Sequence, residues 1–461
     1  MTRARFDVAV VGAGAAGMMA AAVAGQRGLR VVLIDHAERL AEKIRISGGG
    51  RCNFTNLGAG PAQFLSRNPD FCRSALRAYG PQDFLDLLRA HGVSWHEKHR
   101  GQLFCDDSSE SVIRVLRQEC DSGGVTWRMP CRVQSVLRET DDFVLSTDAG
   151  PIRAAQLVLA TGGMAIPQLG ATDFSLRIAR QFGLKIVEPR PALVPLTFDA
   201  AHWRPYAALS GVALEVRLSH EPSAPGEGGA APGLSDGPHT SASGGGRAAG
   251  RSARAGRKHR RGGDRAEFLE DLLFTHRGLS GPGILQISSY WQPGEPIRID
   301  LAPGQAMGDA LVAAKQGSRQ TLLTALSGIW PRRLAEAWLA GGGATDASAA
   351  ETAGHALEHG APAALGGQRL ADVPDRRLRA LGEGIHGWTL WPTGTAGYKK
   401  AEVMRGGVDT DELDQRSLQA HRCPGLHVIG EAVDVTGWLG GYNFQWAWAS
   451  GVACGRALEA A

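Results

Sequence analysis

Residues 6–17 read FDVAVVGAGAAG, an apolar run typical of a buried strand, followed by a glycine-rich turn. The next segment, Met18–Arg27, is rich in small residues and predicts a helix that ends at Gly28. Val31–Ile34 predicts a second strand, closed by Asp35. A strand, a helix and a strand in this order predict a βαβ unit whose strands are parallel.

The turn has the spacing of a dinucleotide-binding fingerprint. Gly12 permits a tight turn, Gly14 lets backbone N–H groups approach a pyrophosphate, and Gly17 lets the helix and the strand pack closely. The helix N-terminus would present a partial positive charge to the phosphates, and Asp35 would accept hydrogen bonds from the adenosine ribose. The residues expected to bind the dinucleotide here are Gly12, Gly14, Ala15, Ala16, Gly17 and Asp35.

Two further motifs favour FAD as the dinucleotide. Leu157–Gly163 (LVLATGG) resembles the second strand and ATG turn of two-dinucleotide-fold flavoproteins, and Gly430–Asp434 (GEAVD) resembles the motif that holds the FAD ribityl and pyrophosphate. No second GxGxxG follows a predicted strand, so NAD(P)H, if it is a transient reductant, has no dinucleotide-binding domain of its own. These motifs add Thr161, Gly162, Gly163, Gly430, Glu431 and Asp434 to the expected FAD-binding residues.

Two glycine loops are expected at the flavin end of the cofactor. In residues 47–56 (SGGGRCNFTN), backbone N–H groups and Asn53 could bond the flavin pyrimidine edge, while Lys43 and Arg51 could meet phosphate. Gly440–Asn443 (GGYN) precedes the last predicted helix, whose N-terminus would stabilise the anionic reduced flavin. The residues expected from these loops are Lys43, Ser47, Gly48, Gly49, Arg51, Asn53, Gly441, Tyr442 and Asn443.

The length of 461 residues predicts two or three domains. Apolar residues make up 43% of the chain and charged residues 21%, as in a folded soluble protein. The last segment again combines a predicted buried strand with a helix, as the opening unit does. It is expected to complete the first domain, into which the other domains are inserted. The expected boundaries are 1–190 for the first part of an FAD-binding domain, 191–308 with 382–394 for a β domain, 309–381 for a helical insert, and 395–461 for the completing segment.

Periodicity predicts the remaining elements. The expected helices are 72–92, broken at Gly80–Pro81, and then 109–120, 309–340, 346–381 and Asn443–Leu458. Antiparallel strands are expected over Val125–Trp127, Arg132–Arg138 and Phe143–Thr147, and further strands over Leu193–Phe198, Val212–Leu218, Ile297–Leu301 and Leu426–Ile429.

The basic charge is concentrated in one segment. Residues 221–265 hold eight Arg or Lys and four acidic residues, and this surplus equals the net charge of +4 for the whole chain. The fold as a whole therefore gives no case for a nucleic-acid surface, and no nucleic-acid partner is expected. Residues 221–263 are poor in large apolar side chains and predict a disordered loop, with contact to an anionic partner as the alternative.

The seven cysteines are scattered, with no CxxC pair and no Cys/His set at zinc spacing, so no metal site is predicted. This usage favours a reduced, cytoplasmic compartment. The run Val8–Ala24 imitates a signal peptide, but Asp7 and the ordered glycines argue against export. No stretch is long and apolar enough to predict a membrane span.

Three segments, Lys43–Asn56, Leu273–Leu285 and Gly406–Gly451, together resemble one flavoprotein family, the BaiN-like or YhiN-like family that includes aminoacetone oxidase and a bile-acid-intermediate reductase. The resemblance implies an α/β fold: a Rossmann-like FAD-binding domain of two-dinucleotide-fold type with a parallel sheet, an inserted β-barrel-like domain and a small helical domain. It also implies non-covalent FAD. The residues that it assigns to the flavin are Gly48, Gly49, Arg51, Cys52 and Asn53, with Val133 at the adenine.

The outer loops at 101–107, 170–174 and 417–421 depart from the family pattern, so the resemblance does not identify the substrate. His276 and Tyr442 are the candidate acid–base residues, since both can exchange protons with a substrate. The expected function is an FAD-dependent oxidoreductase that transfers hydride between FAD and a small organic substrate, as an NAD(P)H-dependent reductase. The alternatives are an amine oxidase that uses oxygen, and a non-catalytic FAD-binding or RNA-associated protein. The oligomeric state is not predicted.

Overall fold

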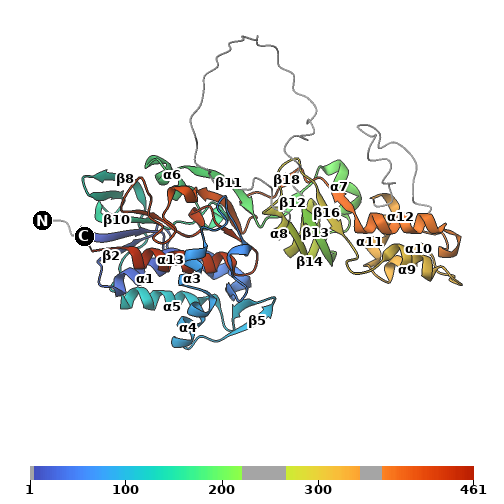
Figure 1. The fold of residues 1–461 in the computed structure, drawn as a ribbon, viewed down its shortest axis with the longest axis horizontal. Helices are drawn as coiled ribbons and strands as arrows, with labels where there is room; N and C mark the ends of the chain where they lie inside the picture. The colour runs from blue at the N-terminus through green and yellow to red at the C-terminus, as the bar shows by residue number, and fades with distance from the viewer. Residues whose placement is uncertain (1–4, 221–265, 343–365, 461) are drawn as a thin grey trace, which may run out of the picture.

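The computed structural model describes residues 5–220, 266–342 and 366–460. These residues form a larger lobe, which holds both ends of the chain, and a narrower lobe that extends away from it (Figure 1). The loop expected at 221–263 lies outside the described residues, as does much of the helix expected over 346–381.

The central sheet of the larger lobe is parallel. Its parallel strands are β1 (Arg5–Val11), β2 (Val31–Ile34), β7 (Thr126–Arg128), β10 (Ile152–Leu159) and β20 (Leu426–Val428). β1 pairs with β2 on one side and with β10 on the other, β7 pairs with β2, and β20 pairs with β10. This order makes the fold a Rossmann-like α/β fold, as the βαβ pattern predicts.

A hairpin extends the sheet beyond β10. It consists of β8 (Val133–Glu139) and β9 (Asp142–Thr147), and β9 pairs antiparallel with β10. The expectation that Val125–Trp127 forms an antiparallel strand is wrong, because β7 adds in parallel to the opposite edge of the sheet. An alternating pattern of side chains indicates a strand but does not say which neighbour that strand joins.

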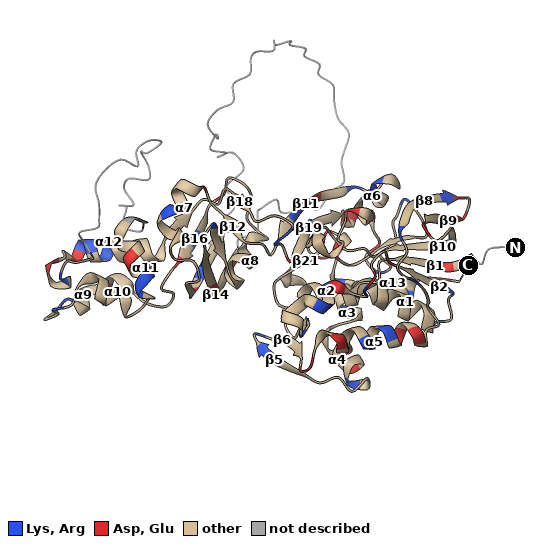
Figure 2. Cartoon of the chain, turned by 180° about the vertical axis from the view of Figure 1, so that it is seen from behind, with Lys and Arg blue, Asp and Glu red and all other residues tan. Residues whose placement is uncertain are grey.

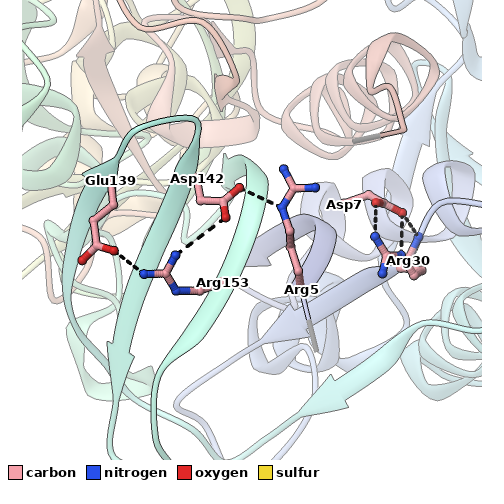
Figure 3. Close-up of polar contacts among 6 residues, drawn as sticks. All are labelled: Arg5, Asp7, Arg30, Glu139, Asp142 and Arg153. Atoms are coloured by element: carbon pink, nitrogen blue, oxygen red, sulfur yellow. Dashed lines mark hydrogen bonds and ion pairs between the residues drawn. The ribbon is translucent and has the colours of Figure 1, made fainter. Parts of the chain in front are cut away.

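Ion pairs tie β1 to the segment before β2 and to β9 (Figure 3). Asp7 accepts hydrogen bonds from the backbone N–H of Arg30 at 2.8 Å and from its guanidinium at 2.7 Å, just before β2. Asp142 in β9 accepts from Arg5 Nε at 2.9 Å and lies 3.8 Å from Arg153 Nη1. These contacts join both edges of β1 to the rest of the lobe.

Three helices lie along one side of the parallel sheet: α1 (Ala15–Gln26), α5 (Ser109–Ser122) and α13 (Tyr442–Ala457) (Figure 1). The last helix packs against the first through glycines. A Cβ at Gly451 would lie 2.7 Å from the carbonyl oxygen of Ala16, and one at Gly455 would lie 2.8 Å from that of Ala20. The C-terminal segment thus belongs to the first structural unit.

The remaining elements of the larger lobe lie around this core. They are α2 (Glu42–Ile46), β4 (Phe64–Leu65), α3 (Arg73–Ala78), α4 (Pro81–Ala90), α6 (Phe174–Gln181) and β21 (Thr436–Gly437), with a three-stranded sheet of β3 (Asn53–Asn56), β6 (Gln102–Cys105) and β5 (Trp95–His99). The break expected at Gly80–Pro81 separates α3 from α4, because Pro81 begins the second helix after the Gly80 cap.

The narrower lobe contains an antiparallel sheet of seven strands. In spatial order these are β17 (Trp388–Leu390), β16 (Ile297–Asp300), β13 (Ala213–His220), β14 (Ala266–Thr275), β15 (Gly278–Ser280), β12 (Leu196–Thr197) and β18 (Gly394–Thr395). Its helices are α7 (Ala200–Ala207), α8 (Pro282–Ser288), α9 (Met307–Ala314), α10 (Leu322–Ser327), α11 (Arg332–Ala337) and α12 (Asp375–His386).

The helix expected over 309–340 is divided into α9, α10 and α11, and Gly328 and Pro331 lie at the break between the last two. These helices share one buried core with the antiparallel sheet. Trp338 and Trp388 meet edge to face with ring centroids 5.3 Å apart, and Trp330 Nε1 donates to the carbonyl oxygen of Leu301 at 2.9 Å. The β and helical insertions therefore pack as one body.

The lobes are joined by β11 (Ile186–Ala192) and β19 (Val403–Val408), which pair antiparallel. Among the described residues, no helix is long and apolar enough to span a bilayer. The described residues also contain no cluster of three or more His, Cys, Asp or Glu arranged for a metal ion.

Candidate active site

A cavity of about 960 Å³ lies at the carboxyl ends of β1, β2 and β10. Ligands of open parallel sheets bind at this edge. One end of the cavity is built by the Gly12 turn and Asp35, and we call it the adenine end. The other is built by Asn53, Gly440 and Gly441, and we call it the flavin end. Residues of the β11 and β19 segments also line it.

At the adenine end, two glycines of the turn are required by packing and one is not. A Cβ at Gly12, whose φ is +109°, would lie 2.4 Å from the carbonyl oxygen of Ala160. One at Gly17 would lie 1.8 Å from the carbonyl oxygen of Gly12. A Cβ at Gly14 would meet nothing within 4 Å, so the absence of a side chain there serves the cavity. The α1 N-terminus has no side-chain cap, which leaves N–H donors for a pyrophosphate.

Asp35 is held in place by backbone donors. Its Oδ2 accepts from the Ala13 N–H at 2.7 Å, and its Oδ1 accepts from the Ala37 N–H at 2.9 Å. A carboxylate has further lone pairs, so these bonds leave capacity for the hydroxyls of a ribose. The carboxylate is therefore oriented before any ligand arrives.

At the flavin end, Asn53 Oδ1 is buried and has no hydrogen-bond partner within the part of the chain that the structure describes. The amide nitrogen of Asn53 donates to Gln102 Oε1 at 3.3 Å. Gly441, the N-cap of α13, has a φ of +94°, and a Cβ there would lie 2.9 Å from Asn53 Oδ1. A buried acceptor without a partner is costly, so this carbonyl is suited to a ligand N–H, such as that of a flavin pyrimidine ring.

Between the two ends, Glu431 links three segments. It accepts from Lys43 Nζ at 2.9 Å and from the Met404 N–H at 2.9 Å. Gly163 lies behind it, since a Cβ there would be 2.9 Å from Glu431 Oε1. The ammonium group expected to meet phosphate is thus neutralised by a carboxylate in this structure.

The cavity brings together most of the residues expected to bind cofactor. Those that line it are Gly12, Gly14, Ala15, Ala16, Asp35, Lys43, Ser47, Gly48, Gly49, Asn53, Val133, Thr161, Gly162, Gly430, Glu431, Gly441 and Asn443. Those that do not line it are Gly17, Arg51, Cys52, Gly163, Asp434 and Tyr442.

Three of the non-lining residues have other partners. Cys52 is fully buried, and desolvation raises the pKa of its thiol. Asp434 accepts from the Arg67 N–H at 2.9 Å, and burial raises the pKa of its carboxyl. The ring of Tyr442 packs edge to face against Trp438, and burial raises the pKa of its hydroxyl. The structure therefore does not place the Tyr442 hydroxyl in the cavity as a catalytic acid.

The structure places His276 just beyond the end of β14 and not among the residues that line the cavity. Phe268, near the start of this strand, meets the cavity residue Trp438 with centroids 5.1 Å apart. His276 follows the opposite end of the strand, roughly 25 Å further along at the rise of an extended chain. It is exposed there, next to Thr275, whose carbonyl accepts from Trp203.

Sequence reasoning missed several lining residues, including Leu193, Gln102, Trp438 and Glu402. Among them, Glu402 is the one that carries a titratable side chain. Glu402 is an exposed residue of the cavity wall, and desolvation raises the pKa of its carboxyl to about 7. No motif surrounds this residue in the sequence, so only the fold could reveal it.

Residues 6–457 match the model of the family described as HI0933-like protein Rossmann domain. The chain belongs to this family. It is 41% identical over 466 residues to "Ribosomal RNA dihydrouridine synthase" of Escherichia coli (strain K12), covering 99% of each chain. It is 37% identical to the protein of the same name from Haemophilus influenzae, covering 98% of each. It is 26% identical to "3-dehydro-bile acid delta(4,6)-reductase" of Clostridium scindens, also covering 98% of each.

As a member of this family, the chain is an FAD-dependent oxidoreductase with a Rossmann-like fold. The open space at Gly14 and the unpartnered Asn53 carbonyl fit an FAD. The expectation of no nucleic-acid partner is contradicted, because two relatives at 41% and 37% identity are named for ribosomal RNA. The charge argument failed because net charge sums over the whole surface, whereas binding of a polyanion depends on where cations lie.

Proposed function

We propose that this protein reduces a uridine of ribosomal RNA to dihydrouridine in an FAD-dependent reaction. The observation that carries the proposal is the end-to-end similarity to two ribosomal RNA dihydrouridine synthases, at 41% and 37% identity over nearly the whole chain. The non-catalytic alternative is set aside, because the family is one of oxidoreductases. We further propose a cytoplasmic site of action, where a ribosomal RNA substrate is found.

The cavity supports this chemistry. The uracil C5=C6 bond is conjugated to the C4 carbonyl, so its reduction needs a hydride at C6 and a proton at C5. Reduced FAD, when bound, supplies the hydride. The chain would hold the cofactor through the α1 N-terminus, Asp35 and Asn53, and position the base against it. We propose NAD(P)H as the transient source of electrons.

An RNA substrate also needs cations beside the cavity. The β5–β6 hairpin carries exposed Lys98, His99 and Arg100, on the side of the larger lobe that faces the narrower lobe (Figure 2). Arg100 pairs with Glu270 of β14, so the hairpin bridges the two lobes. We propose that this hairpin contacts RNA phosphates, while the target base is turned out of its stack and into the cavity.

A second candidate is reduction of a small unsaturated ketone, favoured by the 26% identity to the bile-acid reductase. This candidate keeps the narrower BaiN-like resemblance and the small organic substrate inferred from the sequence. Both candidates reduce a carbon–carbon double bond conjugated to a carbonyl, so they differ in what the cavity admits and not in the chemistry. The oxidase alternative differs in the electron acceptor.

The test is anaerobic incubation of the holoenzyme with NAD(P)H and protein-free ribosomal RNA transcript, followed by digestion and mass spectrometry of the nucleosides. We expect dihydrouridine at a defined position and flavin reoxidation that depends on RNA. A matched control is Gly14→Glu, which would fill the space left for the pyrophosphate. Reduced flavin that is stable to RNA but is reoxidised by a steroid enone, or only by oxygen, would contradict the proposal.

A further inference from the structure

The backbone of Glu402 is held in place in the wall of the cavity. Its N–H donates to the carbonyl oxygen of Leu193 at 3.1 Å, and the adjoining Val403 pairs with Ala192 across the β11–β19 ladder. Leu193 and Val403 pack with Leu439, which precedes the glycines of the flavin end. The backbone of Glu402 is thus anchored, and its side chain lies near the flavin end of the cavity.

Glu402 differs from the other carboxylates that line the cavity. Each of the others has a partner in the protein. Asp35 accepts hydrogen bonds from backbone N–H groups, and Glu431 pairs with Lys43. Glu42 lies 3.2 Å from Arg45, and Asp173 lies 3.8 Å from Arg177. The Glu402 carboxyl makes no hydrogen bond or ion pair with any residue that the structure describes. A carboxyl that lines a cavity and has no protein partner is free to meet a molecule that enters the cavity.

The pKa of the Glu402 carboxyl also lies close to neutral pH. Desolvation raises the pKa of its carboxyl to about 7, and no charged group contributes to this shift. Among charged residues on the segments around it, Lys43 and Glu431 pair with each other, and Arg405 donates to the Ser289 carbonyl at 2.6 Å. An acid with a pKa near the working pH is suited to proton transfer.

The other proton donors near the cavity are excluded by their positions. The Cys52 thiol is buried away from the cavity, Tyr442 packs against Trp438, and His36 lies 3.5 Å from Asp35 at the adenine end. Lys43 is bonded to Glu431. Glu402 is therefore the acid at the flavin end that a substrate could reach.

We propose that Glu402 is the catalytic acid that protonates C5 of the substrate uracil; this role rests on the function proposed above. With reduced FAD bound, the cofactor would supply a hydride to C6, which would break the C5=C6 π bond and leave an electron pair shared by C5 and O4. That pair takes the proton of the Glu402 carboxyl, forming the C5–H bond and leaving a carboxylate. The uracil is reduced, the flavin is oxidised, and the carboxylate regains a proton from solvent through the open cavity.

The test compares Glu402→Gln with wild type and with Glu188→Gln, an acid-to-amide change at an exposed position of β11. Glu402→Gln should bind FAD normally, measured by fluorescence, and should be reduced by NAD(P)H at the wild-type rate. Its RNA-dependent flavin reoxidation should fall by about a hundredfold or more. In wild type and in Glu188→Gln this step should slow as pH rises through about 7, and in Glu402→Gln that dependence should vanish.

A readout independent of turnover is the infrared carbonyl band of a protonated carboxyl in the FAD-free protein at pH 6, which Glu402→Gln should lack. Glu402→Asp should restore part of the rate and the pH limb if a carboxylic acid is what matters. Equal dihydrouridine formation by wild type and Glu402→Gln would overturn the role of Glu402 alone. A loss of FAD binding or of flavin reduction in Glu402→Gln would make the residue structural and also overturn it. Absence of dihydrouridine with wild type would overturn the proposed function itself.

Discussion

The two ends of the cavity are built on different principles. The adenine end comes from one continuous stretch, residues 12–35, and its acid Asp35 is bonded to backbone N–H groups on both oxygens. The flavin end is assembled from segments far apart in the chain, and it keeps two polar groups without partners among the described residues, Asn53 Oδ1 and the Glu402 carboxyl. We therefore propose that the adenine end serves affinity and the flavin end serves chemistry.

The largest effect is expected for Gly17→Ala at the adenine end. The new Cβ would lie 1.8 Å from the carbonyl oxygen of Gly12, a clash between backbones that no rotamer can relieve. Overpacking of this kind should lower the free energy of unfolding of the FAD-free protein by about 3 kcal/mol, measured by denaturant titration.

Gly14→Ala is the matched control for this prediction, because its Cβ would meet no protein atom. It should change the free energy of unfolding by less than about 0.5 kcal/mol, but weaken FAD binding by about tenfold. Equal destabilisation by the two substitutions would show that Gly14 has a structural role and not a ligand-binding one.

The second prediction concerns Asp35→Ala at the adenine end. Removal of the carboxylate leaves the N–H groups of Ala13 and Ala37 without their acceptor, so the FAD-free protein should lose about 2 kcal/mol of stability. Thermal unfolding of the FAD-free protein would measure this loss. An unchanged midpoint would mean that solvent replaces the carboxylate and that the site is not prearranged.

At the flavin end, Asn53→Ala should affect FAD affinity more than stability, in contrast to Asp35→Ala. Its carbonyl has no partner to lose, so the stability of the FAD-free protein should fall by no more than about 1 kcal/mol, while FAD affinity should fall by several-fold through one lost hydrogen bond. Isothermal titration with FAD checks the affinity. A large loss of stability with unchanged FAD affinity would contradict the assignment of Asn53 to the ligand.

A further prediction is a pH dependence of stability from Glu402. Its pKa is raised from 4.5 to about 7 in the folded chain, so between these values the folded state holds a proton that the unfolded state has released. The free energy of unfolding should therefore fall as pH rises from about 4.5 to about 7. Glu402→Gln should remove this slope in the FAD-free protein, and an unchanged slope would assign it to another group.

The same contrast explains what the sequence could predict. The turn Gly12–Gly17 and the strand Val31–Ile34 could be predicted from the sequence. Strand, turn and helix follow one another there within a few residues, and each has a local physical signature. The places of Glu402 and Leu193 in the cavity could not be predicted. These residues meet only because β11 pairs with β19, and some two hundred residues of insertion separate the two strands in the sequence. His276 lies in a motif typical of the family, yet the length of β14 carries it away from the cavity.

We propose that the cavity holds an FAD whose electrons go to a uracil of ribosomal RNA. The most direct measurement is stopped-flow absorbance of the NAD(P)H-reduced holoenzyme mixed without oxygen with ribosomal RNA transcript. We expect flavin reoxidation at a rate that rises with RNA concentration, with one dihydrouridine formed per flavin reoxidised. Reduced flavin that persists in the presence of RNA and is reoxidised only when air is admitted would contradict it.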